Sequence, residues 1–471
     1  MRTEKDFLGE VEIPDNVYYG VQTMRALENF KITGYTADKE FIISLGIVKK
    51  AAALANMEVG LLDATIGKAI VQAADEIIEG KMFTEFPVDP IQGGAGTSFN
   101  MNVNEVLANR ALEILGRDRG DYAYISPNNH SNMSQSTNDV FPTAIRVCTI
   151  RRGKKLIKSL KELADELEKK GSEFKNVLKI GRTHLQDAVP ITLGEEFFAY
   201  ASSVRRAKKR VDRTMTFLHE VNMGATAVGT GLNADPEYIK AVARHLSNLT
   251  GEDFKTASNL VDATNNTDVF ADVSGSLKVT ALALIKIAND LRLMASGPRA
   301  GLHEICLPAR QPGSSIMPGK VNPVIPEVVN QTCYQVIAND LAVTMGVENG
   351  QFELNVMEPV IAFNIFNSLR FLTNAIDTFK NLCIKDIKAN EAMCQAWLDK
   401  SVGIVTALLP HIGYEQCSAL AKEALANERG IKDLVLEKNI ITAEDLNVIL
   451  SPKEMTEPGI AGKSLLCKRC I

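Results

Sequence analysis

Residues 193–218 read LGEEFFAYASSVRRAKKRVDRTMTFL, and the apolar side chains of this stretch recur at the spacing of one long helix. The positions on the apolar face are Leu193, Phe197, Tyr200, Val204, Ala207, Val211, Met215 and Leu218. Their mean spacing lies between the coiled-coil and the straight-helix period, as is typical of a helix packed in a bundle. We therefore predict a bundle helix that follows Pro190.

Four further stretches show the same kind of pattern. The first carries four leucines on one face, namely Leu156, Leu160, Leu163 and Leu167. It is expected to begin near Pro142, because proline suits the first turn of a helix. Residues 269–294 are apolar nearly all round, which predicts a helix buried on several sides. Residues 324–347 and 360–379 complete the set.

These five helices decide the expected fold. A helix of roughly 25–30 residues is about 40–45 Å long, which exceeds what one compact domain needs. The surplus apolar surface is best covered by further copies of the chain, so we predict an oligomer. The fold class that follows is all-α, built around a long central five-helix bundle.

The length of 471 residues and the mass of 51.4 kDa imply more than one domain. We predict three. Residues 1–137 form a mostly helical N-terminal domain with a helical stretch at 45–80, and residues 138–392 hold the central bundle. Residues 393–471 form a small C-terminal domain, because the helical patterns there are short and interrupted by glycine and proline.

Composition narrows the choice of partners. A hydrophobic content of 45% with 23% charged residues is ordinary for a soluble globular protein. The net charge is −5, and the basic residues form no single stripe, so neither nucleic acid nor an anionic membrane is an expected partner. No apolar run reaches the length of a membrane-spanning helix. An anionic ligand would have to be attracted by a few local cations and backbone amides.

Two features of the sequence bear on the location of the protein, its first residues and its cysteines. The first seven residues include acidic side chains and no apolar core, so no secretory signal is expected. The eight cysteines are scattered through apolar helical patterns, which favours buried thiols and a cytoplasmic location. Cys467 and Cys470 form a lone CxxC near the C-terminal end, for which a metal or redox role is not expected. Because no grouping of His, Cys, Asp and Glu has metal-ligand spacing, we predict no tightly bound catalytic metal. We also expect no cofactor.

Polar segments outside the helical patterns need an explanation. Residues 313–322, Gly-Ser-Ser-Ile-Met-Pro-Gly-Lys-Val-Asn, form a loop whose hydroxyls, lysine and amide can converge on one small anion. Surface loops also collect Gly, Ser and Pro, so composition alone favours a plain loop. Residues 93–100 form a glycine-rich turn whose backbone amides can approach an anion. The turn lacks the lysine of a nucleotide-binding P-loop, and by itself it is more often structural.

Two further polar segments precede predicted bundle helices. Residues 132–139 end in four successive polar residues, whereas a helix cap needs only one, and the surplus donors suit a carboxylate. Residues 181–190 place Thr183, His184 and Gln186 ahead of the next helix. A single histidine is more often a structural hydrogen-bonding group than a catalyst. His184 therefore gains weight only beside the other segments.

The tripeptide Ala295-Ser296-Gly297 matches the one that cyclises into the electrophilic cofactor of histidine and phenylalanine ammonia-lyases. A match of three residues arises easily by chance. This one closes an apolar helix just before Pro298, so we expect an ordinary helix end.

Taken together, these segments resemble the fumarase/aspartase superfamily over nearly the whole chain. The loop 313–322 is similar to the most recognisable motif of that superfamily, and residues 183–188 and 224–231 are similar to the flanking ones. The resemblance implies a mainly helical chain of three domains whose bundles form a homotetramer with a twenty-helix core. It also implies active sites that are shared between three subunits.

Within the superfamily, the chain resembles the aspartate ammonia-lyase branch more than the class II fumarases. Thr137 stands where fumarases usually have a second serine, and residues 323–327 read Pro-Val-Ile-Pro-Glu where fumarases tend to read Pro-Thr-Gln-Cys-Glu. Met357 and Glu358 stand where fumarases favour phenylalanine and a basic residue. The implied reaction converts a small dicarboxylate, L-aspartate, reversibly to fumarate and ammonia. It proceeds by removal of a Cβ proton through an aci-carboxylate.

The resemblance also implies roles for individual residues. The expected general base is Ser314, while His184 and Asn138 are expected near the leaving amine. The residues expected to bind the β-carboxylate are Thr97, Ser136, Thr137 and Ser315. Those expected at the α-carboxylate are Thr183, Lys320 and Asn322, with Lys320 also counted as catalytic.

Two alternatives remain open from the sequence. A class II fumarate hydratase would use the same residues on malate. A catalytically silent structural protein is the second alternative, because one branch of the superfamily serves as an eye-lens crystallin. The presence of Thr97, His184, Ser314, Lys320 and Asn322 together argues against the silent protein.

Overall fold

The computed structural model describes residues 1–469, together with the side chains up to residue 466. Within this part of the chain α-helices dominate, and every named strand belongs to a two-stranded sheet. The all-α fold class predicted from the sequence is therefore confirmed. Cys467 and Cys470 lie outside the described side chains, so the expectation for their CxxC stays a prediction.

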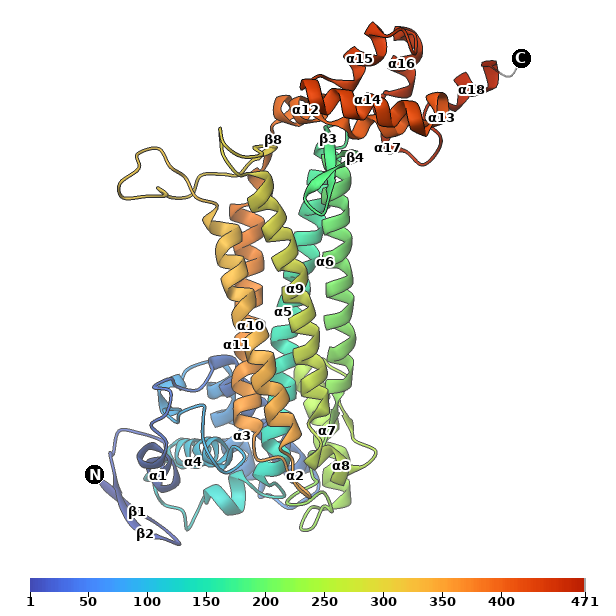
Figure 1. Cartoon of the computed structure of the whole chain (residues 1–471). Helices are drawn as coiled ribbons and strands as arrows, with labels where there is room; N and C mark the ends of the chain where they lie inside the picture. Colours follow the sequence, from blue (N-terminus) through green and yellow to red (C-terminus); the bar gives the residue numbers. More distant parts are fainter. Residues whose placement is uncertain (470–471) are drawn as a thin grey trace. The chain divides into compact units, whose positions relative to one another are not determined.

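The five longest helices are the five that the apolar spacing predicts (Figure 1). They are α5 (Thr137–Glu173), α6 (Leu193–Thr216), α9 (Asp268–Met294), α10 (Val324–Glu348) and α11 (Glu358–Leu382). The longest, α5, has 37 residues, and the shortest, α6, has 24. Even α6 is therefore roughly 36 Å long.

Shorter elements connect these helices. The other α-helices are α1 (Val21–Asn29), α2 (Lys39–Glu58), α3 (Ala64–Ile78), α4 (Thr97–Ile114), α7 (Pro236–Thr250), α8 (Leu260–Asn265), α12 (Glu391–Lys400), α13 (Leu409–Ile412), α14 (Tyr414–Asn427), α15 (Ile431–Glu437), α16 (Ala443–Ile449), α17 (Pro452–Thr456) and α18 (Lys463–Arg469). Antiparallel pairs are formed by β1 (Arg2–Asp6) with β2 (Gly9–Ile13), β3 (Leu178–Thr183) with β4 (Gln186–Thr192), and β7 (Ile305–Cys306) with β8 (Lys388–Ala389). The pair β5 (Glu220–Val221) and β6 (Lys255–Thr256) is parallel.

The chain folds into two compact units, each built from three separate segments. Unit 1 comprises Met1–Lys158, Ala207–Leu282 and Thr332–Thr373. Unit 2 comprises Ser159–Arg206, Ala283–Gln331 and Asn374–Ile471. The division into domains at residues 137 and 392 stays a prediction.

The start of α5 differs from the prediction. The helix begins at Thr137, so Pro142 lies inside it and not in its first turn. A proline has no N–H to bond the carbonyl of the residue four positions earlier, which is Asn138. That carbonyl instead accepts a hydrogen bond of 2.9 Å from the side chain of Asn222. A contact between distant segments thus satisfies the group that the proline leaves free.

The helical stretch predicted at 45–80 is in fact two helices, α2 and α3, separated by a short turn. The second helix starts where the carboxylate of Asp63 accepts hydrogen bonds from the backbone N–H groups of Thr65 and Ile66. An acidic residue that caps the first turn in this way is a strong start signal for a new helix.

The start of α6 also differs in detail, because Pro190 lies within β4 and not at the head of the helix. The helix is capped by Thr192 and Glu195. The Thr192 hydroxyl accepts from the Glu195 N–H at 3.1 Å, and the Glu195 carboxylate accepts from the Thr192 N–H at 3.1 Å. This reciprocal capping box fixes the end of the β3–β4 hairpin to the beginning of α6.

Aromatic side chains form part of the core of unit 1. The ring of Phe41 lies 5.5 Å from that of Phe99, 5.4 Å from that of Phe141 and 5.3 Å from that of Phe366, measured between centroids. Edge-to-face rings at such separations add stabilisation beyond their buried area. The cluster therefore ties α2, α4, α5 and α11 together.

The helix α9, predicted to be buried on several sides, keeps one apolar face exposed in the single chain. Val279 is 37% exposed and Leu282 is 51% exposed. The neighbouring helix α10 exposes Tyr334, Leu341 and Met345 to a similar degree.

In the described part of the chain no helix is both long and apolar enough to cross a membrane.

Candidate active site

The glycine-rich turn of unit 1 delivers Thr97 to the start of α4. Gly96 caps the helix with a φ of 89°, in the left-handed region that side chains disfavour. A Cβ on Gly96 would lie 2.5 Å from Cγ of Phe141, so no side chain fits there. The hydroxyl of Thr97 donates to the carbonyl of Gly94 at 2.7 Å and remains exposed. Backbone conformation and close packing together require glycine at this turn.

The start of α5 lies beside the start of α4. The side-chain nitrogen of Asn100 donates to the hydroxyl of Thr137 at 3.1 Å, which joins the first turns of the two helices. The backbone N–H of Asn138 donates to the hydroxyl of Ser136, and the Asn138 amide donates to the carbonyl of Ala227 at 2.7 Å. Unit 1 therefore brings the predicted residues Ser136, Thr137 and Asn138 together at one helix N-terminus, where an anion is favoured.

A buried carboxylate holds this helix start in place. Asp139 is fully buried and accepts hydrogen bonds from the backbone N–H groups of Ser136, Gly224 and Thr226 at 3.0–3.2 Å. Burial raises the pKa of Asp139 to about 7, and the hydrogen bonds from the three N–H groups oppose that rise. The contacts join residues 136–139 to the segment 224–231, which the sequence analysis had singled out by resemblance alone.

A buried cation lies beneath the same segment. Lys49 of α2 is 1% exposed, and its ammonium donates to the side-chain oxygens of Asn132 and Gln135 at 3.0 and 2.9 Å. Burial lowers the pKa of Lys49 to about 7, while the charge of Asp139 raises it. Sequence reasoning missed Lys49. The available signal was a charged residue inside an apolar helix, but the adjacent Lys50 gives the same signal and instead pairs with Asp75.

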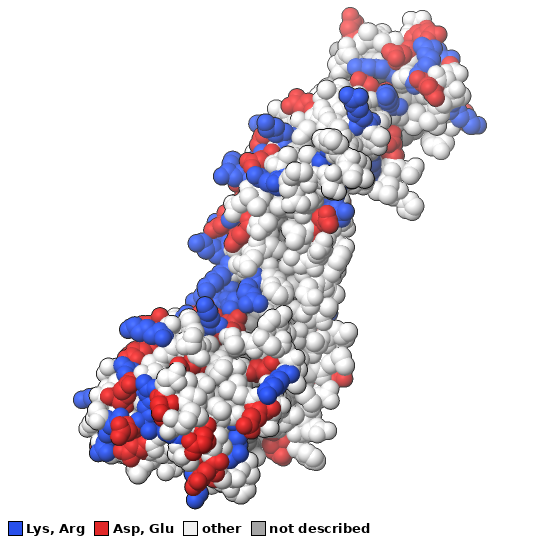
Figure 2. Space-filling model, turned by 90° about the vertical axis from the view of Figure 1, so that its left-hand side faces the viewer, with Lys and Arg blue, Asp and Glu red and all other residues white. Residues whose placement is uncertain are grey.

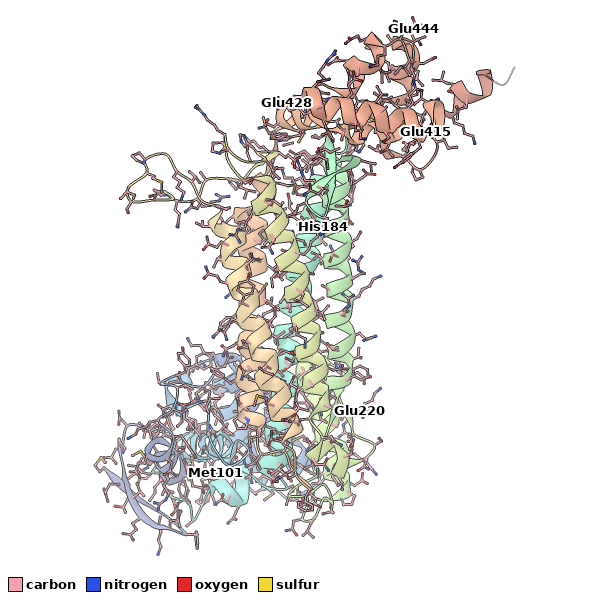
Figure 3. All side chains as sticks on the ribbon, in the orientation of Figure 1. Met101, His184, Glu220, Glu415, Glu428 and Glu444 are labelled. Atoms are coloured by element: carbon pink, nitrogen blue, oxygen red, sulfur yellow. The ribbon has the colours of Figure 1, made fainter. Side chains whose placement is uncertain are left out.

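His184 lies in the turn of the β3–β4 hairpin of unit 2 (Figure 3). Thr183 pairs with Gln186, so His184 and Leu185 are the two turn residues, and their φ values are 56° and 61°. Two residues with positive φ define the hairpin turn that usually carries Asn-Gly. The side chains of Thr183 and His184 are both exposed.

Buried ion pairs fix the base of this hairpin. Glu304 is fully buried, and its carboxylate lies 2.8 Å from Arg182 and 3.2 Å from Lys179, both on β3. A second acidic residue, Glu196 of α6, lies 2.8 Å from Lys179. The hairpin is therefore anchored directly below Thr183, and none of these anchors was predicted from the sequence.

The loop 313–322 of unit 2 is closed at its base by its own polar groups. The N–H of Gly313 donates to the carbonyl of Lys320 at 2.7 Å, and the Asn322 amide donates to the carbonyl of Gly313 at 2.8 Å. A Cβ on Gly313 would lie 2.8 Å from the Lys320 carbonyl oxygen, so glycine is required for this closure. The Lys320 side chain is exposed.

Within the loop, the hydroxyl oxygen of Ser314 accepts hydrogen bonds from two backbone N–H groups. These belong to Ile316 and Met317, each at 3.2 Å. Two such donors stabilise negative charge on an oxygen, as in an oxyanion hole. Ser315 lies beside Ser314 on the exposed part of the loop.

The predicted site residues fall into both units. Thr97, Ser136, Thr137 and Asn138 belong to unit 1, and the remaining six belong to unit 2, namely Thr183, His184, Ser314, Ser315, Lys320 and Asn322. Their joint use in one site stays a prediction. Among the described residues no cluster of three His, Cys, Asp or Glu side chains is placed to hold a metal ion.

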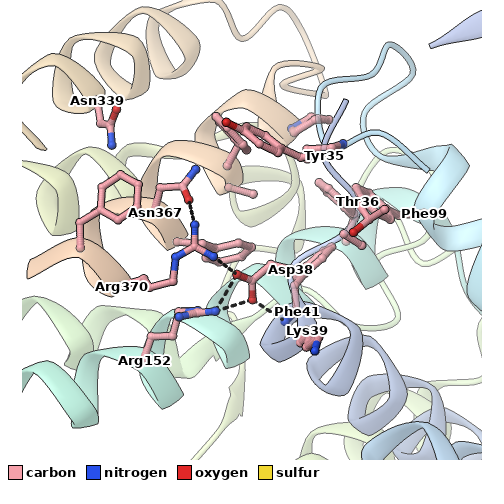
Figure 4. Close-up of a pocket in the computed structure, with 18 of the residues that line it drawn as sticks. Tyr35, Thr36, Asp38, Lys39, Phe41, Phe99, Arg152, Asn339, Asn367 and Arg370 are labelled. Carbon is pink, nitrogen blue, oxygen red and sulfur yellow. Dashed lines mark hydrogen bonds and ion pairs between the residues drawn. The ribbon is translucent and has the colours of Figure 1, made fainter. Parts of the chain in front are cut away.

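A cavity of about 780 Å³ in unit 1 contains none of the predicted site residues (Figure 4). Its lining includes seven aromatic side chains and an ion-pair cluster. In that cluster the carboxylate of Asp38 contacts Arg152 at 2.5 Å and Arg370 at 3.8 Å. Such a cavity is large enough for a small molecule. The polar chemistry that the sequence analysis identified nevertheless lies elsewhere.

Comparison with known families classifies the chain. Residues 9–338 match the family described as lyase, and residues 404–457 match the family described as fumarase C C-terminus. The chain therefore belongs to the lyase family that includes the fumarases and aspartases, as the resemblance had predicted.

Individual relatives agree along nearly the full length. An aspartate ammonia-lyase of a Bacillus species is 59% identical over 463 residues, which cover 98% of this chain and 99% of the relative. The aspartate ammonia-lyase of Escherichia coli K12 is 46% identical, with 98% of each chain covered.

Solved structures show the same fold. A cobalt-bound protein described as fumarate lyase:delta crystallin from Brucella melitensis superposes with a TM-score of 0.95 at 49% identity, covering 97% of this chain and 100% of that one. A class II fumarase from Schistosoma mansoni gives 0.92 at 37% identity, covering 97% and 99%. The fold is thus shared by members with different substrates, so the substrate has to be argued separately.

Proposed function

We propose that the protein is an aspartate ammonia-lyase, which converts L-aspartate reversibly to fumarate and ammonia. The observation that carries this proposal is the identity of 46–59% to aspartate ammonia-lyases over nearly the whole chain. The class II fumarase among the solved structures is less similar, at 37%. Fumarate hydratase is therefore the rival activity to be measured beside it.

The chemistry explains why so many hydroxyl and amide groups are needed. Removing a proton from Cβ places a second negative charge on the adjacent carboxylate, and that aci-carboxylate has to be stabilised. Preorganised donors in a site that excludes water are the usual solution. We assign the β-carboxylate to Thr97, Ser136 and Thr137 of unit 1, together with Ser315. The position of the first three at helix N-termini supports this assignment.

We assign proton removal to Ser314. A serine hydroxyl is a weak base unless its oxyanion is stabilised. The two N–H groups of Ile316 and Met317 already point at this oxygen, which supports the assignment. Gly319, with a φ of 81°, and Gly313 give the loop the freedom to close over a substrate.

The α-carboxylate and the amine are assigned to the remaining residues. Lys320 supplies a cation, and Thr183 and Asn322 supply hydrogen bonds that fix the geometry of the reacting C–H bond. His184 and Asn138 are placed near the leaving amine. In the loop conformation described above, the Asn322 amide donates one N–H to the carbonyl of Gly313, which leaves its second N–H to contact the substrate.

We infer that the enzyme works as a homotetramer whose active sites are shared between three subunits. The exposed apolar faces of α9 and α10 support self-association, because large exposed apolar patches mark interaction surfaces. On α10 these residues are Tyr334, Ala338, Leu341 and Met345. Figure 2 shows a broad area along the long helices with few charged side chains. Shared sites would also bring the residues of units 1 and 2 from different copies together.

We further infer a cytoplasmic location. Five of the six cysteines that the structure describes are buried free thiols, and the sixth is exposed and also free. An exposed thiol without a disulfide partner suits a reducing compartment.

The deciding experiment compares two substrates under the same conditions. Formation of fumarate, followed by its ultraviolet absorbance, is measured from L-aspartate and separately from L-malate, with ammonia release as a second readout for aspartate. We expect fumarate and ammonia from aspartate and little or no fumarate from malate. Turnover of malate without turnover of aspartate would replace the proposal by fumarate hydratase, and absence of both would favour the silent protein.

A further inference from the structure

Among the six cysteines that the structure describes, only Cys306 is exposed. The other five are buried, and burial raises the pKa of each of these thiols, to about 12 for Cys333, Cys383 and Cys394. A buried thiol with a raised pKa is a poor nucleophile. Cys306 is therefore the only one of the six in a position to react with a solute.

The sulfur of Cys306 is part of a group of polar side chains. It lies 3.4 Å from Nε2 of His303, and Nδ1 of the same ring lies 3.3 Å from the side-chain nitrogen of Asn390. An imidazole held by a third group can alter the reactivity of a thiol that it contacts. This cluster lies in unit 2 and shares no residue with the proposed active site.

The hydrogen bonds indicate which nitrogen of the His303 ring carries the proton. The side-chain oxygen of Asn390 accepts from the N–H of Met393 at the start of α12, so the amide nitrogen faces His303. Because that nitrogen donates, Nδ1 of His303 accepts, and in the neutral ring the proton lies on Nε2. The ring therefore donates a hydrogen bond to the sulfur of Cys306. This differs from cysteine proteases, where the imidazole accepts the thiol proton.

A positively charged side chain, Lys388, lies on the same face as this sulfur. In the β7–β8 pair, Cys306 lies directly opposite Lys388, while Ile305 lies opposite Ala389. Residues opposite each other in an antiparallel pair share one face, with Cβ atoms about 4.5–5.5 Å apart. Ile305 is fully buried, whereas Cys306 and Lys388 are both exposed. Lys388 has no ion pair with the side chains that the structure describes.

Backbone hydrogen bonds hold the turn that carries His303. His303 has a φ of 48°, which is unusual for a residue other than glycine. Its N–H donates to the carbonyl of Ser296, and the N–H of Leu302 donates to the Ser296 hydroxyl, both at 3.0 Å. The tripeptide Ala295-Ser296-Gly297 thus acts as the helix end that the sequence analysis expected. It also fixes the turn that presents His303.

We propose that Cys306 is a covalent modification site for small α,β-unsaturated carboxylates, fumarate above all. The sulfur accepts a hydrogen bond from His303, and the Lys388 ammonium attracts a carboxylate toward the same face. The inference rests on the proposed function only in naming fumarate as the electrophile that the enzyme itself releases.

The reaction is an addition that needs no oxidant. The Cys306 thiol gives its proton to solvent, and a sulfur electron pair forms a C–S bond with one olefinic carbon of fumarate. The π electrons move to the other olefinic carbon, which takes a proton from water. The product is a succinyl thioether that contains all atoms of both reactants.

The experiment uses the full-length folded enzyme with Cys467 and Cys470 replaced by serine, so that only the six described thiols remain. The protein is incubated with fumarate or with the neutral reagent N-ethylmaleimide, and adducts are located and timed by peptide mass spectrometry. We expect both reagents to label Cys306 first, and Cys306→Ser to remove the early adduct. Labelling of Cys306 no faster than the five buried thiols would overturn the proposal.

Two variants test the roles of the neighbours. His303→Asn keeps a residue that tolerates positive φ, and it should slow both reagents about tenfold, since a hydrogen bond to an ionised group is lost. Lys388→Gln should slow fumarate about fivefold relative to N-ethylmaleimide, because one attraction of a charge at close range is removed. The control Lys385→Gln changes the net charge equally on the same segment and should have little effect. Unchanged rates in His303→Asn would also refute the proposal.

The result is independent of catalysis, because fumarate is supplied as a reagent. Selective labelling of Cys306 in a protein without ammonia-lyase activity would refute the proposed function alone. Full ammonia-lyase activity without preference for Cys306 would refute this inference alone.

Discussion

Replacing Gly96 by alanine should destabilise unit 1 for two separable reasons. The φ of 89° lies in the left-handed region, where a Cβ costs about 1–2 kcal/mol. The new Cβ would also lie 2.5 Å from Cγ of Phe141, and forcing an extra carbon into a packed core costs about 1–3 kcal/mol. We therefore expect Gly96→Ala to lower the free energy of unfolding by about 2–5 kcal/mol.

Gly94 provides a matched control. Its φ is 91°, but a Cβ there would find its nearest neighbour, Cβ of Thr97, at an ordinary 3.8 Å. Gly94→Ala should therefore show only the conformational cost of about 1–2 kcal/mol. The difference between the two variants isolates the collision with Phe141.

The assay is urea unfolding followed by far-ultraviolet circular dichroism. All variants are measured at the same protein concentration, because the unfolding of an oligomer depends on concentration. Gly96→Ala should unfold at a clearly lower urea concentration than Gly94→Ala. Equal losses in the two variants would show that the contact with Phe141 does not constrain this turn, and the reasoning would fail.

Other variants test the site, the assembly and the pH dependence. Ser314→Ala should fold and should still bind fumarate in calorimetry. Its kcat should fall about 10²–10⁴-fold, which is the range for loss of a general base. Near-normal turnover would show that Ser314 is not the base. Lys320→Ala should lower kcat/KM through lost charge and positioning, and an unchanged value would contradict the assignment. Leu341 is 62% exposed on α10, and Leu341→Asp should shift the sedimentation coefficient toward smaller species. The control Leu425→Asp, at a residue 68% exposed on α14, should leave the sedimentation coefficient unchanged. A stable oligomer in both variants would argue against the α10 interface. Arg25 makes two hydrogen bonds to the Asp6 carboxylate, and they lower the pKa of Asp6 below its usual 3.8. The contact therefore stabilises the folded protein above about pH 3.8, and this stabilisation is lost as the pH falls below that value. Arg25→Gln should lower the urea midpoint at neutral pH and flatten its fall at acid pH, because the Asp6 carboxylate loses its partner. An unchanged acid dependence would refute the linkage.

Periodicity predicted the long helices well because their burial is decided by local pattern. The predicted range 269–294 became Asp268–Met294, and 324–347 became Val324–Glu348. The start of α5 was not predictable in the same way. Its first turns depend on Asn222, a residue 84 positions away, which occupies the carbonyl that Pro142 leaves unbonded.

The residues of the proposed site were chosen from polar segments of the sequence, whereas the buried groups that support these segments were not predicted. The segment 132–139 was recognisable because its polar residues exceed the needs of a helix cap, and the loop 313–322 because it is similar to the most recognisable motif of the superfamily. The supporting groups Lys49 and Glu304 are buried by tertiary packing, and nothing in the local sequence distinguishes them from exposed charged residues. The β3–β4 hairpin was missed for a related reason, because His184 and Leu185 stand where the turn usually has Asn-Gly.

The turn at residues 184 and 185 has a consequence for any attempt to raise the thermal stability of the protein. Two side-chain-bearing residues in a left-handed conformation cost about 1–2 kcal/mol each, and Leu185, 72% exposed, recovers little of this by burial. Directed evolution for heat resistance would therefore favour Asn-Gly at positions 184 and 185. Such a selection would remove the His184 imidazole, which we assign to the leaving amine. The selected variants should therefore be more stable and less active.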